Sequence, residues 1–188
     1  MILQGPFSAS ASTSLSSAFI AILELFAHIA FAEDGKLEEA VEAYKKALII
    51  KPDDAEVYYN MGAAFAQQGK LEEAVESGKK SLSLKPNYAD AYNNLGNVFA
   101  AQGKLGDAIE AYNKALVIKS DYADAHLSLG FALLKSGELK RGLDEYEWRW
   151  KSTKFMSTKR HFLQPLWDGQ TSLKDKRILL WCEQGVGD

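Results

Sequence analysis

The chain has 188 residues, of which 47% are apolar and 25% charged, and its formal net charge is -3. That balance is typical of a folded, soluble protein. The slight excess of acidic residues argues against a dedicated binder of nucleic acid or of anionic membranes. A single cysteine, Cys182, excludes an intramolecular disulfide and, within its apolar run, is expected to be a buried, inert thiol.

The N-terminal segment allows two interpretations. Residues 1–20, rich in small polar side chains, are expected to be a flexible tail that leads into a first helix. The apolar run Ala18–Ala32 is too short and too polar to span a membrane, so we expect a cytoplasmic protein. The alternative is export after cleavage of a signal peptide over residues 1–32. Ala30-Phe31-Ala32 fits a cleavage site, but the first basic residue is only Lys36.

A period of 34 residues runs through most of the remaining chain. It is marked by Gly35, Gly69, Gly103 and Gly137, and by Pro52, Pro86 and Ser120. Apolar and small residues between these marks fall at helical spacing, which predicts two helices in each period. The glycine suits the end of the first helix, and proline stops the second. One such hairpin cannot bury its apolar face alone, whereas stacked neighbours can.

The blocks that begin at residues 55 and 89 agree at many fixed offsets: they read "AEVYYNMGAAFAQQGKLEEAVESGKKSLSLKP" and "ADAYNNLGNVFAAQGKLGDAIEAYNKALVIKS". This pattern resembles the tetratricopeptide repeat. The resemblance implies an all-α fold, a right-handed superhelical solenoid of helical hairpins. Its units would be a degenerate first unit at residues 21–54, followed by residues 55–88, 89–122 and 123–151.

Two departures from the pattern concern stability and metal binding. Gly78 stands where other units have Tyr44, Tyr112 and Tyr146. A glycine inside a helix costs about 1 kcal/mol relative to alanine, and here it also removes a packing group, so the second helix of this unit is expected to be the softest. His28 is expected to be an exposed capping residue, because no second ligand lies at helical spacing; no metal and no cofactor are predicted.

The resemblance also assigns a binding surface. In this family the first helix of each unit lines a concave groove, which binds extended peptides or partner helices. Carried over, the groove residues are Glu56, Tyr59, Asn60, Ala63, Gln67, Asp90, Asn93, Asn94, Asn97, Ala101, Asp124, Leu127, Ser128, Phe131 and Lys135. Only Lys135 is basic, which disfavours a clamp for a partner's C-terminal carboxylate.

Asn60 and Asn94 resemble the asparagine ladder of O-linked N-acetylglucosamine transferases, in which stacked amides grip a peptide backbone. An amide can pair with a peptide unit whatever its side chain, because it both donates and accepts hydrogen bonds. Ser128 takes the third place in the ladder. The alternative is that both asparagines are merely solvated residues of the helix surface.

The composition changes after residue 140, where basic residues outnumber acidic ones and aromatic residues are interleaved. Nucleic-acid binding is one interpretation. A helix end and a linker over residues 152–176 are favoured, because "QPLWDGQTSLKDK" has the composition of a loop between domains. The last stretch, "RILLWCEQGVGD" at residues 177–188, is typical of a buried strand that enters a glycine-rich turn.

With "YEWRW" and "PLWDG" upstream, this ending resembles bacterial proteins in which tetratricopeptide repeats precede a glycosyltransferase-like domain of two Rossmann halves. The resemblance implies that Asp188, after Gly187, would be a general base in an intact parent enzyme, which would also bind a sugar nucleotide. A single strand cannot form a sheet or close a pocket. The chain as it stands is therefore expected not to be an enzyme.

The expected function is that of a protein-interaction scaffold, which binds an extended peptide or a partner helix in its concave groove. One alternative is a fragment of a glycosyltransferase whose repeats present the acceptor. A second alternative is a structural module that self-associates through the exposed ends of its solenoid.

Overall fold

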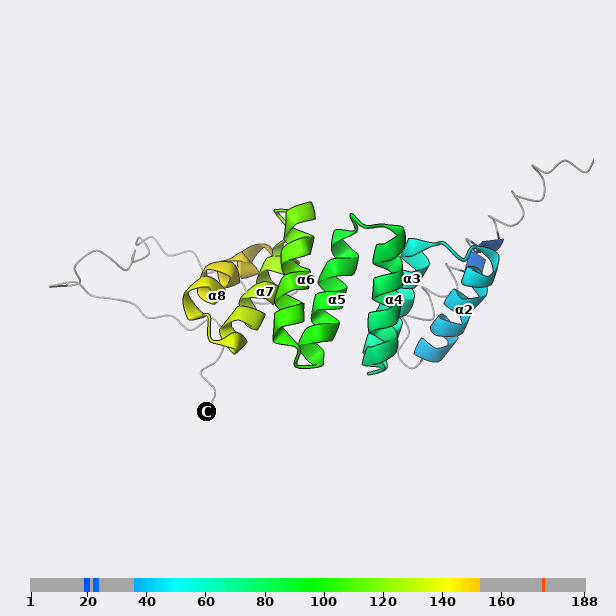
Figure 1. The fold of residues 1–188 in the computed structure, drawn as a ribbon, viewed down its shortest axis with the longest axis horizontal. Coiled ribbons are helices and arrows are strands. Elements are labelled where there is room, and N and C mark those ends of the chain that lie inside the picture. Colours follow the sequence, from blue (N-terminus) through cyan, green and yellow to red (C-terminus); the bar gives the residue numbers. More distant parts are fainter. Residues whose placement is uncertain (1–18, 21, 24–35, 153–173, 175–188) are drawn as a thin grey trace, which may run out of the picture.

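The computed structural model describes residues 19–20, 22–23, 36–152 and 174. The continuous stretch 36–152 folds into seven α-helices and one 3-10 helix (Figure 1). These are α2 (Leu37–Ile50), α3 (Ala55–Gln67), α4 (Leu71–Leu84), α5 (Ala89–Ala101), α6 (Leu105–Ile118), α7 (Ala123–Ser136), α8 (Leu139–Tyr146) and η1 (Glu147–Lys151). The described stretch contains no strand, which confirms the all-α prediction. The strand expected within residues 177–188 lies outside the described residues.

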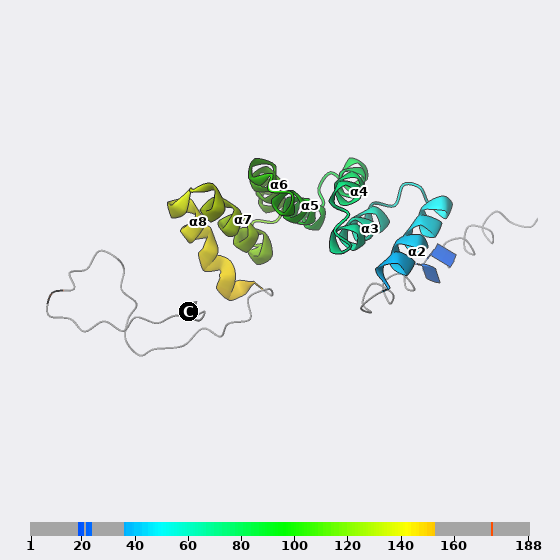
Figure 2. The ribbon, with the colours of Figure 1, turned by 90° about the horizontal axis from the view of Figure 1, so that it is seen from below.

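Consecutive helices form hairpins that stack side by side. α3 packs on α4, α5 on α6 and α7 on α8, while α4 with α5 and α6 with α7 join one hairpin to the next. α2 packs on α3 and is the second helix of the predicted first unit. Seen end-on in Figure 2, the hairpins form a curved row with α3, α5 and α7 along its inner side. The first helices also touch one another, α3 with α5 and α5 with α7.

Glycine ends each of the three first helices. Gly69, Gly103 and Gly137 have φ angles of 74°, 76° and 92°. At Gly69 the next backbone N–H, that of Lys70, donates to the carbonyl of Phe65 at 2.9 Å, which is the Schellman arrangement. A residue with a Cβ adopts this left-handed backbone only with strain. The period of glycines therefore sets where the first helices stop, as the sequence predicts.

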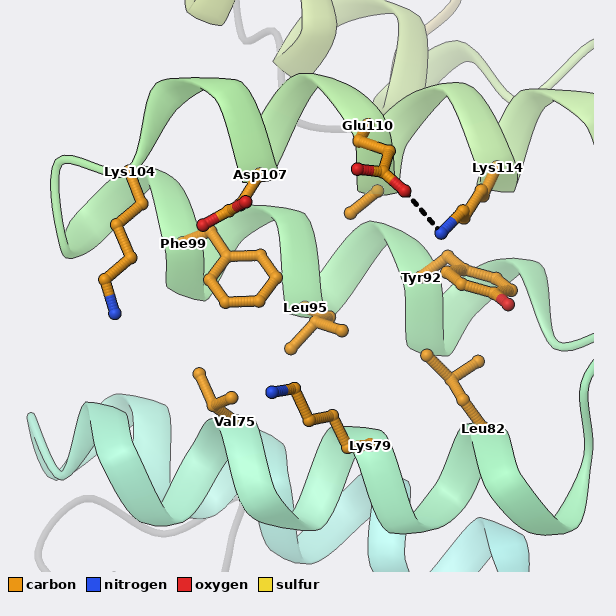
Figure 3. A pocket seen from close by; sticks show the side chains of 11 residues that line it. Val75, Lys79, Leu82, Tyr92, Leu95, Phe99, Lys104, Asp107, Glu110 and Lys114 are labelled. Atoms are coloured by element: carbon orange, nitrogen blue, oxygen red, sulfur yellow. Dashed lines mark ion pairs between the residues drawn. The ribbon is translucent and has the colours of Figure 1, made fainter.

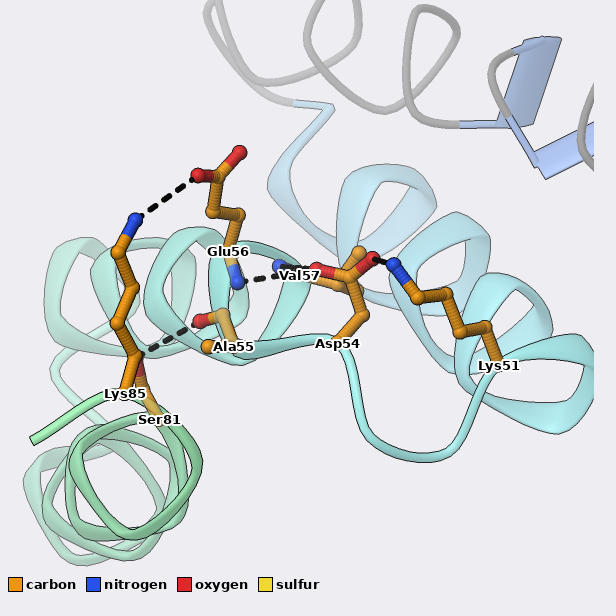
Figure 4. Close-up of polar contacts among 7 residues, drawn as sticks. All are labelled: Lys51, Asp54, Ala55, Glu56, Val57, Ser81 and Lys85. Atoms are coloured by element: carbon orange, nitrogen blue, oxygen red, sulfur yellow. Dashed lines mark hydrogen bonds and ion pairs between the residues drawn. The ribbon is translucent and has the colours of Figure 1, made fainter.

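A carboxylate starts α3. The side chain of Asp54 accepts hydrogen bonds from the backbone N–H groups of Glu56 and Val57, at 3.0 and 3.3 Å. Its second oxygen lies 2.6 Å from Lys51 Nζ (Figure 4). Burial acts to raise the pKa of Asp54, but these hydrogen bonds and the ammonium group outweigh it and hold the pKa below the ordinary value. Asp54 is therefore a charged N-cap that satisfies two otherwise unpaired N–H groups.

α4 buries few apolar side chains. One core cluster joins α2 to α3 and centres on Tyr44, and another joins α6 to α7 and centres on Tyr112. Between them, α4 buries only Ala74, Ser77 and Ser81. Ser81 Oγ compensates in part by donating to the carbonyl oxygen of Ala55 at 2.7 Å (Figure 4). The hairpin of α3 and α4 is thus held by close backbone approach and polar contacts more than by apolar side chains.

The last hairpin departs from the regular repeat at Arg149. The equivalent residues of earlier units are the small, buried Ser81 and Ala115. Arg149 is 8% exposed, and its guanidinium carbon lies 4.6 and 4.5 Å from the ring centres of Tyr146 and Trp150. A guanidinium does not fit the space that a methyl group fills between two close-packed helices. α8 accordingly ends at Tyr146, and η1 turns the chain so that this side chain can stack between the two rings.

Candidate peptide-binding face

The predicted groove residues lie on α3, α5 and α7, five on each helix. At about 100° per residue, positions such as Asp90, Asn94 and Asn97 share one side of α5. Because α5 touches both α3 and α7, the equivalent sides of the three helices form one continuous surface, here called the inner face. The structure thus brings the predicted residues onto a common side of the solenoid.

Exposure separates these residues into two groups. Phe131 is 52% exposed, whereas Leu127 and Asn93 are only 4% and 6% exposed. The remaining twelve are half-buried or exposed. Leu127 therefore belongs to the packing of α7 and presents little surface to a ligand. Asn93 is a buried amide: its Nδ2 lies 3.5 Å from the hydroxyl oxygen of Tyr122, and its Oδ1 has no hydrogen-bond partner among the described residues.

Tyr112 of α6 ties three helices together beneath the inner face. Its ring is 2% exposed and lies directly against Gly96, where a Cβ would sit 2.5 Å from the ring atom Cε1. Its hydroxyl donates to Asn97 Oδ1 at 2.9 Å and also pairs with Ser128. Burial raises the pKa of Tyr112 to about 12, and the hydrogen bond with Ser128 opposes this rise. Asn97 and Ser128, both predicted as ligand-binding residues, thus have a structural partner of their own.

The unit of residues 55–88 lacks this link. Gly78 takes the position of Tyr112, and Ala63 takes the position of Asn97, so the hydroxyl and its acceptor are lost together. Asn94 stands one repeat before Ser128. Its side chain makes no hydrogen bond within the described part of the chain and is half-buried. Its amide is therefore available to a ligand.

Two tyrosines of the inner face were not predicted. Tyr88 and Tyr122 directly precede α5 and α7, and the Tyr88 ring centre lies 5.1 Å from that of Tyr59 on α3. The signal that could have found them is the repeated pattern Tyr-Ala-Asp, at residues 88–90 and 122–124. It was missed because the family's groove positions are counted within the first helix, whereas these residues come just before it.

Asp90 lies at the centre of three tyrosines. Burial, and secondarily the charge of Asp90, raises the pKa of Tyr59. The pKa of Tyr88 rises to about 12 through burial and then through Glu56, Tyr59 and Asp90. Tyr122 is raised by burial and by its hydrogen bond to Asp90. All three shifts arise first from burial, and Asp90 adds to each because a nearby carboxylate disfavours a phenolate.

The cations near this face are already engaged. Lys85 Nζ lies 3.2 Å from Glu56 (Figure 4) and 4.3 Å from the ring centre of Tyr88. Lys119 Nζ lies 4.8 Å from the ring centre of Tyr122. Lys135 is exposed in the last turn of α7. Besides these lysines, the face offers carboxylates, amides and tyrosine rings.

A groove, here called the outer groove, lies on the side of α5 opposite the inner face. It measures about 490 Å³ and is floored by Val75, Leu82, Tyr92, Leu95 and Phe99, with charged side chains at its rim (Figure 3). At the rim, Lys114 Nζ pairs with Glu110 at 2.6 Å. Tyr92, Leu95 and Phe99 recur at helical spacing and point away from the side that carries Asn94. This outer groove follows from the sparse packing of α4 against its neighbours.

The described stretch shows neither a metal-binding group nor a membrane-spanning helix. It contains no group of three or more His, Cys, Asp or Glu side chains arranged to hold a metal ion. None of its helices is both long and apolar enough to cross a membrane. His28, Cys182 and Asp188 lie outside the described residues.

Comparison with known proteins agrees with the geometry. A family model described as TPR repeat matches residues 30–69, 64–103 and 96–137, which together cover more than half of the chain. A crystal structure of MamA aligns with a TM-score of 0.63 and 27% identity, over 74% of this chain and 78% of that one. No curated protein sequence matches.

Two further solved structures are similar to parts of the chain. The Thermobaculum terrenum O-GlcNAc transferase, in a mutant form, aligns with a TM-score of 0.59 and 30% identity, over 63% of this chain and 22% of that one. The first TPR of Spaghetti (RPAP3), bound to an HSP90 peptide, aligns with a TM-score of 0.61 and 22% identity, over 64% and 95%; at that identity the likeness concerns the fold alone. From its period, its stacked hairpins and its family match, this chain belongs to the tetratricopeptide-repeat family.

Proposed function

We propose that this chain is a protein-interaction scaffold that holds an extended segment of a partner protein along its inner face. The observation that carries the proposal is the alignment of α3, α5 and α7, which touch one another in turn and present equivalent residues on one side. A peptide laid along this side meets the same position again in each unit. Repeated, equivalent contacts suit an extended backbone, which itself repeats its N–H and C=O groups.

The amide of Asn94 is the strongest candidate for a backbone contact. It is half-buried at the middle of the inner face and has no hydrogen-bond partner within the described residues. Asn60 stands at the equivalent position of the preceding unit. The MamA and O-GlcNAc transferase structures show that a similar repeat array occurs in proteins of different kinds. The proposal therefore rests on the alignment of the three helices in this chain and on the side chains that they present, and not on what those proteins do.

The proposal is tested with Asn94→Ala and a matched control, Asn113→Ala. Asn113 is exposed on the second helix α6, away from the inner face. Peptides selected from a random displayed library on the full chain serve as probes, and fluorescence anisotropy measures their Kd. Loss of one neutral hydrogen bond costs about 1 kcal/mol, so Asn94→Ala should weaken binding roughly fivefold. Asn113→Ala should leave the Kd unchanged.

Two results would contradict the proposal. Either no library peptide binds the folded chain, or the two asparagine variants bind equally well. If light scattering then shows concentration-dependent oligomers without any peptide ligand, the self-association alternative replaces it.

A second candidate function concerns a longer protein. We propose that the repeats can serve as the acceptor-presenting part of a glycosyltransferase, supported by the 30% identity to the repeat region of the O-GlcNAc transferase and by the strand-like residues 177–188. The chain spans 22% of that enzyme. The encoded sequence after Asp188 is the test: alternating strands and helices with a glycosyltransferase pattern support the idea, and their absence refutes it.

A further inference from the structure

Five residues form a polar and aromatic cluster at the centre of the inner face: Tyr59, Tyr88, Asp90, Asn93 and Tyr122, here called the tyrosine–aspartate cluster. They come from α3, from the turns before α5 and α7, and from α5 itself. The ring centres of Tyr59 and Tyr88 lie 5.1 Å apart, and the hydroxyl of Tyr122 is hydrogen-bonded to Asp90 and 3.5 Å from the Asn93 amide. The cluster therefore joins two successive units, residues 55–88 and 89–122.

The cluster presents hydrogen-bond acceptors and the faces of aromatic rings. Asp90 is an exposed carboxylate, and the tyrosine rings carry negative potential on their faces. Asn93 is more than nine-tenths buried within the cluster, and its Oδ1 has no hydrogen-bond partner among the described residues. A buried acceptor without a donor costs stability that a bound donor can restore. Within the cluster, Asn93 Oδ1 is thus the acceptor that lacks a donor, and it lies beside the pair of Tyr122 and Asp90.

Two lysines of the chain already make cation–π contacts with tyrosine rings of the cluster. Lys85 and Lys119 each hold their ammonium group over a cluster tyrosine, 4.3 Å from the ring centre of Tyr88 and 4.8 Å from that of Tyr122. Both lysines are exposed and belong to the turns after α4 and α6. An ammonium or guanidinium group has only donors, and it gains from both carboxylates and aromatic faces.

We propose that the tyrosine–aspartate cluster binds a cationic side chain, lysine or arginine, of the peptide held by the inner face. The cation lies against the tyrosine rings, pairs with Asp90, and donates to Asn93 Oδ1. Because this oxygen has no exposed surface in the free protein, the Asn93 amide or a neighbouring tyrosine rotates when the ligand enters. The inference rests on the proposed function and adds to it a preference for basic partners. Glu56 and Asp124 stand at the position of Asp90 in the neighbouring units, where Glu56 pairs with Lys85 and Asp124 accepts a hydrogen bond from Ser152.

The test uses the full chain and three sets of synthetic array peptides, in which the charged residues are only Lys and Arg, only Asp and Glu, or absent. The tightest binders of each set are then measured by fluorescence anisotropy. Basic peptides should bind best, and Asp90→Asn should weaken them about threefold to fivefold, the effect of losing an exposed charge pair. The control is Asp107→Asn, which removes the same charge from the exposed rim of the outer groove on α6 and should change the Kd by less than twofold.

Asn93→Leu separates binding from folding. It removes the acceptor while filling a buried site, so the urea midpoint should stay equal or rise while affinity for basic peptides falls several-fold. A variant that loses stability and affinity together would point to a structural role and contradict the proposal.

The remaining outcomes are also decisive. If uncharged or acidic peptides bind as tightly and depend on Asn94, the cluster proposal fails while the proposed function stands. If Asp90→Asn and Asp107→Asn weaken binding equally, the effect is general electrostatics and the cluster is not the site. If no peptide of any set binds, both proposals fail.

Discussion

Gly96→Ala is expected to destabilise the fold strongly, whereas the equivalent change one unit earlier, Gly62→Ala, should be nearly neutral. A Cβ at Gly96 would lie 2.5, 2.7 and 3.0 Å from three ring atoms of Tyr112. That ring cannot move easily, because it is 2% exposed and its hydroxyl is hydrogen-bonded to Asn97. At Gly62 the nearest atoms, Ala74 O and Ser77 Cβ, both lie at 3.3 Å.

The magnitudes follow from two opposing terms. Replacing a helical glycine by alanine stabilises a helix by about 1 kcal/mol at either site. Overpacking a rigid core costs typically 1–3 kcal/mol, and three ring atoms inside contact distance place Gly96 near the top of that range. The expected net loss is therefore roughly 2 kcal/mol at Gly96. At Gly62, where the neighbours need to give only by tenths of an ångström, the two terms should cancel to within about 0.5 kcal/mol.

Urea unfolding followed by circular dichroism measures the difference. The double variant Gly96→Ala with Tyr112→Leu serves as the coupling control, because removal of the ring should abolish most of the alanine penalty. Equal losses at the two glycines, or a double variant whose losses simply add, would refute the reasoning that the ring sets the requirement for glycine.

Other changes test separate features of the fold. Asp54→Ala should lower the free energy of unfolding by about 1 kcal/mol because it removes the N-cap of α3, while the neighbouring Asp53→Ala should not change it. Because the pKa of Asp54 is depressed in the folded state, the stabilisation by the charged cap should be full above about pH 4 and should disappear as the pH falls through that lower pKa. Urea midpoints measured over a pH series would show this loss. Gly78→Ala should stabilise α4 by about 1 kcal/mol, since the new Cβ meets only the Leu95 side chain at 3.4 and 3.8 Å, and amide hydrogen exchange should slow there; unchanged exchange would mean that the glycine does not limit this helix. Tyr112→Phe should lower the free energy of unfolding by about 1 kcal/mol because the hydroxyl contacts are lost. The near-ultraviolet circular dichroism should keep its sign, as expected if the ring stays packed in the core. An unchanged free energy of unfolding would show that the hydroxyl contacts contribute nothing to stability.

Much of the fold is readable from short-range chemistry. Helical spacing, a cap such as Asp54 and a left-handed glycine such as Gly103 act within one or two turns of the chain. Because these signals recur every 34 residues, the hairpins and their stacking could be predicted together. The side of each first helix that forms the inner face was predicted from the resemblance to the tetratricopeptide repeat.

The fate of individual residues on that face depended on contacts between units. Leu127 shares the spacing of a groove residue but turns into the core. Asn97 and Ser128 are ordinary polar residues in the sequence, yet both pair with the Tyr112 hydroxyl, whose position requires α5, α6 and α7 to be stacked. Arg149 ends α8 only because the space it would enter lies between packed helices.

The sequence by itself therefore determined the repeat and the helix ends, since these arise from interactions between residues that are near in the chain, whereas the inner face came from the family resemblance. Only the tertiary structure decided which side chains on that face remain available, and that Tyr88 and Tyr122 join Asp90 in one cluster. These residues come from different units, and the curvature of the stacked hairpins sets the distances between them. That curvature results from packing summed over several helices and is not written in any single repeat.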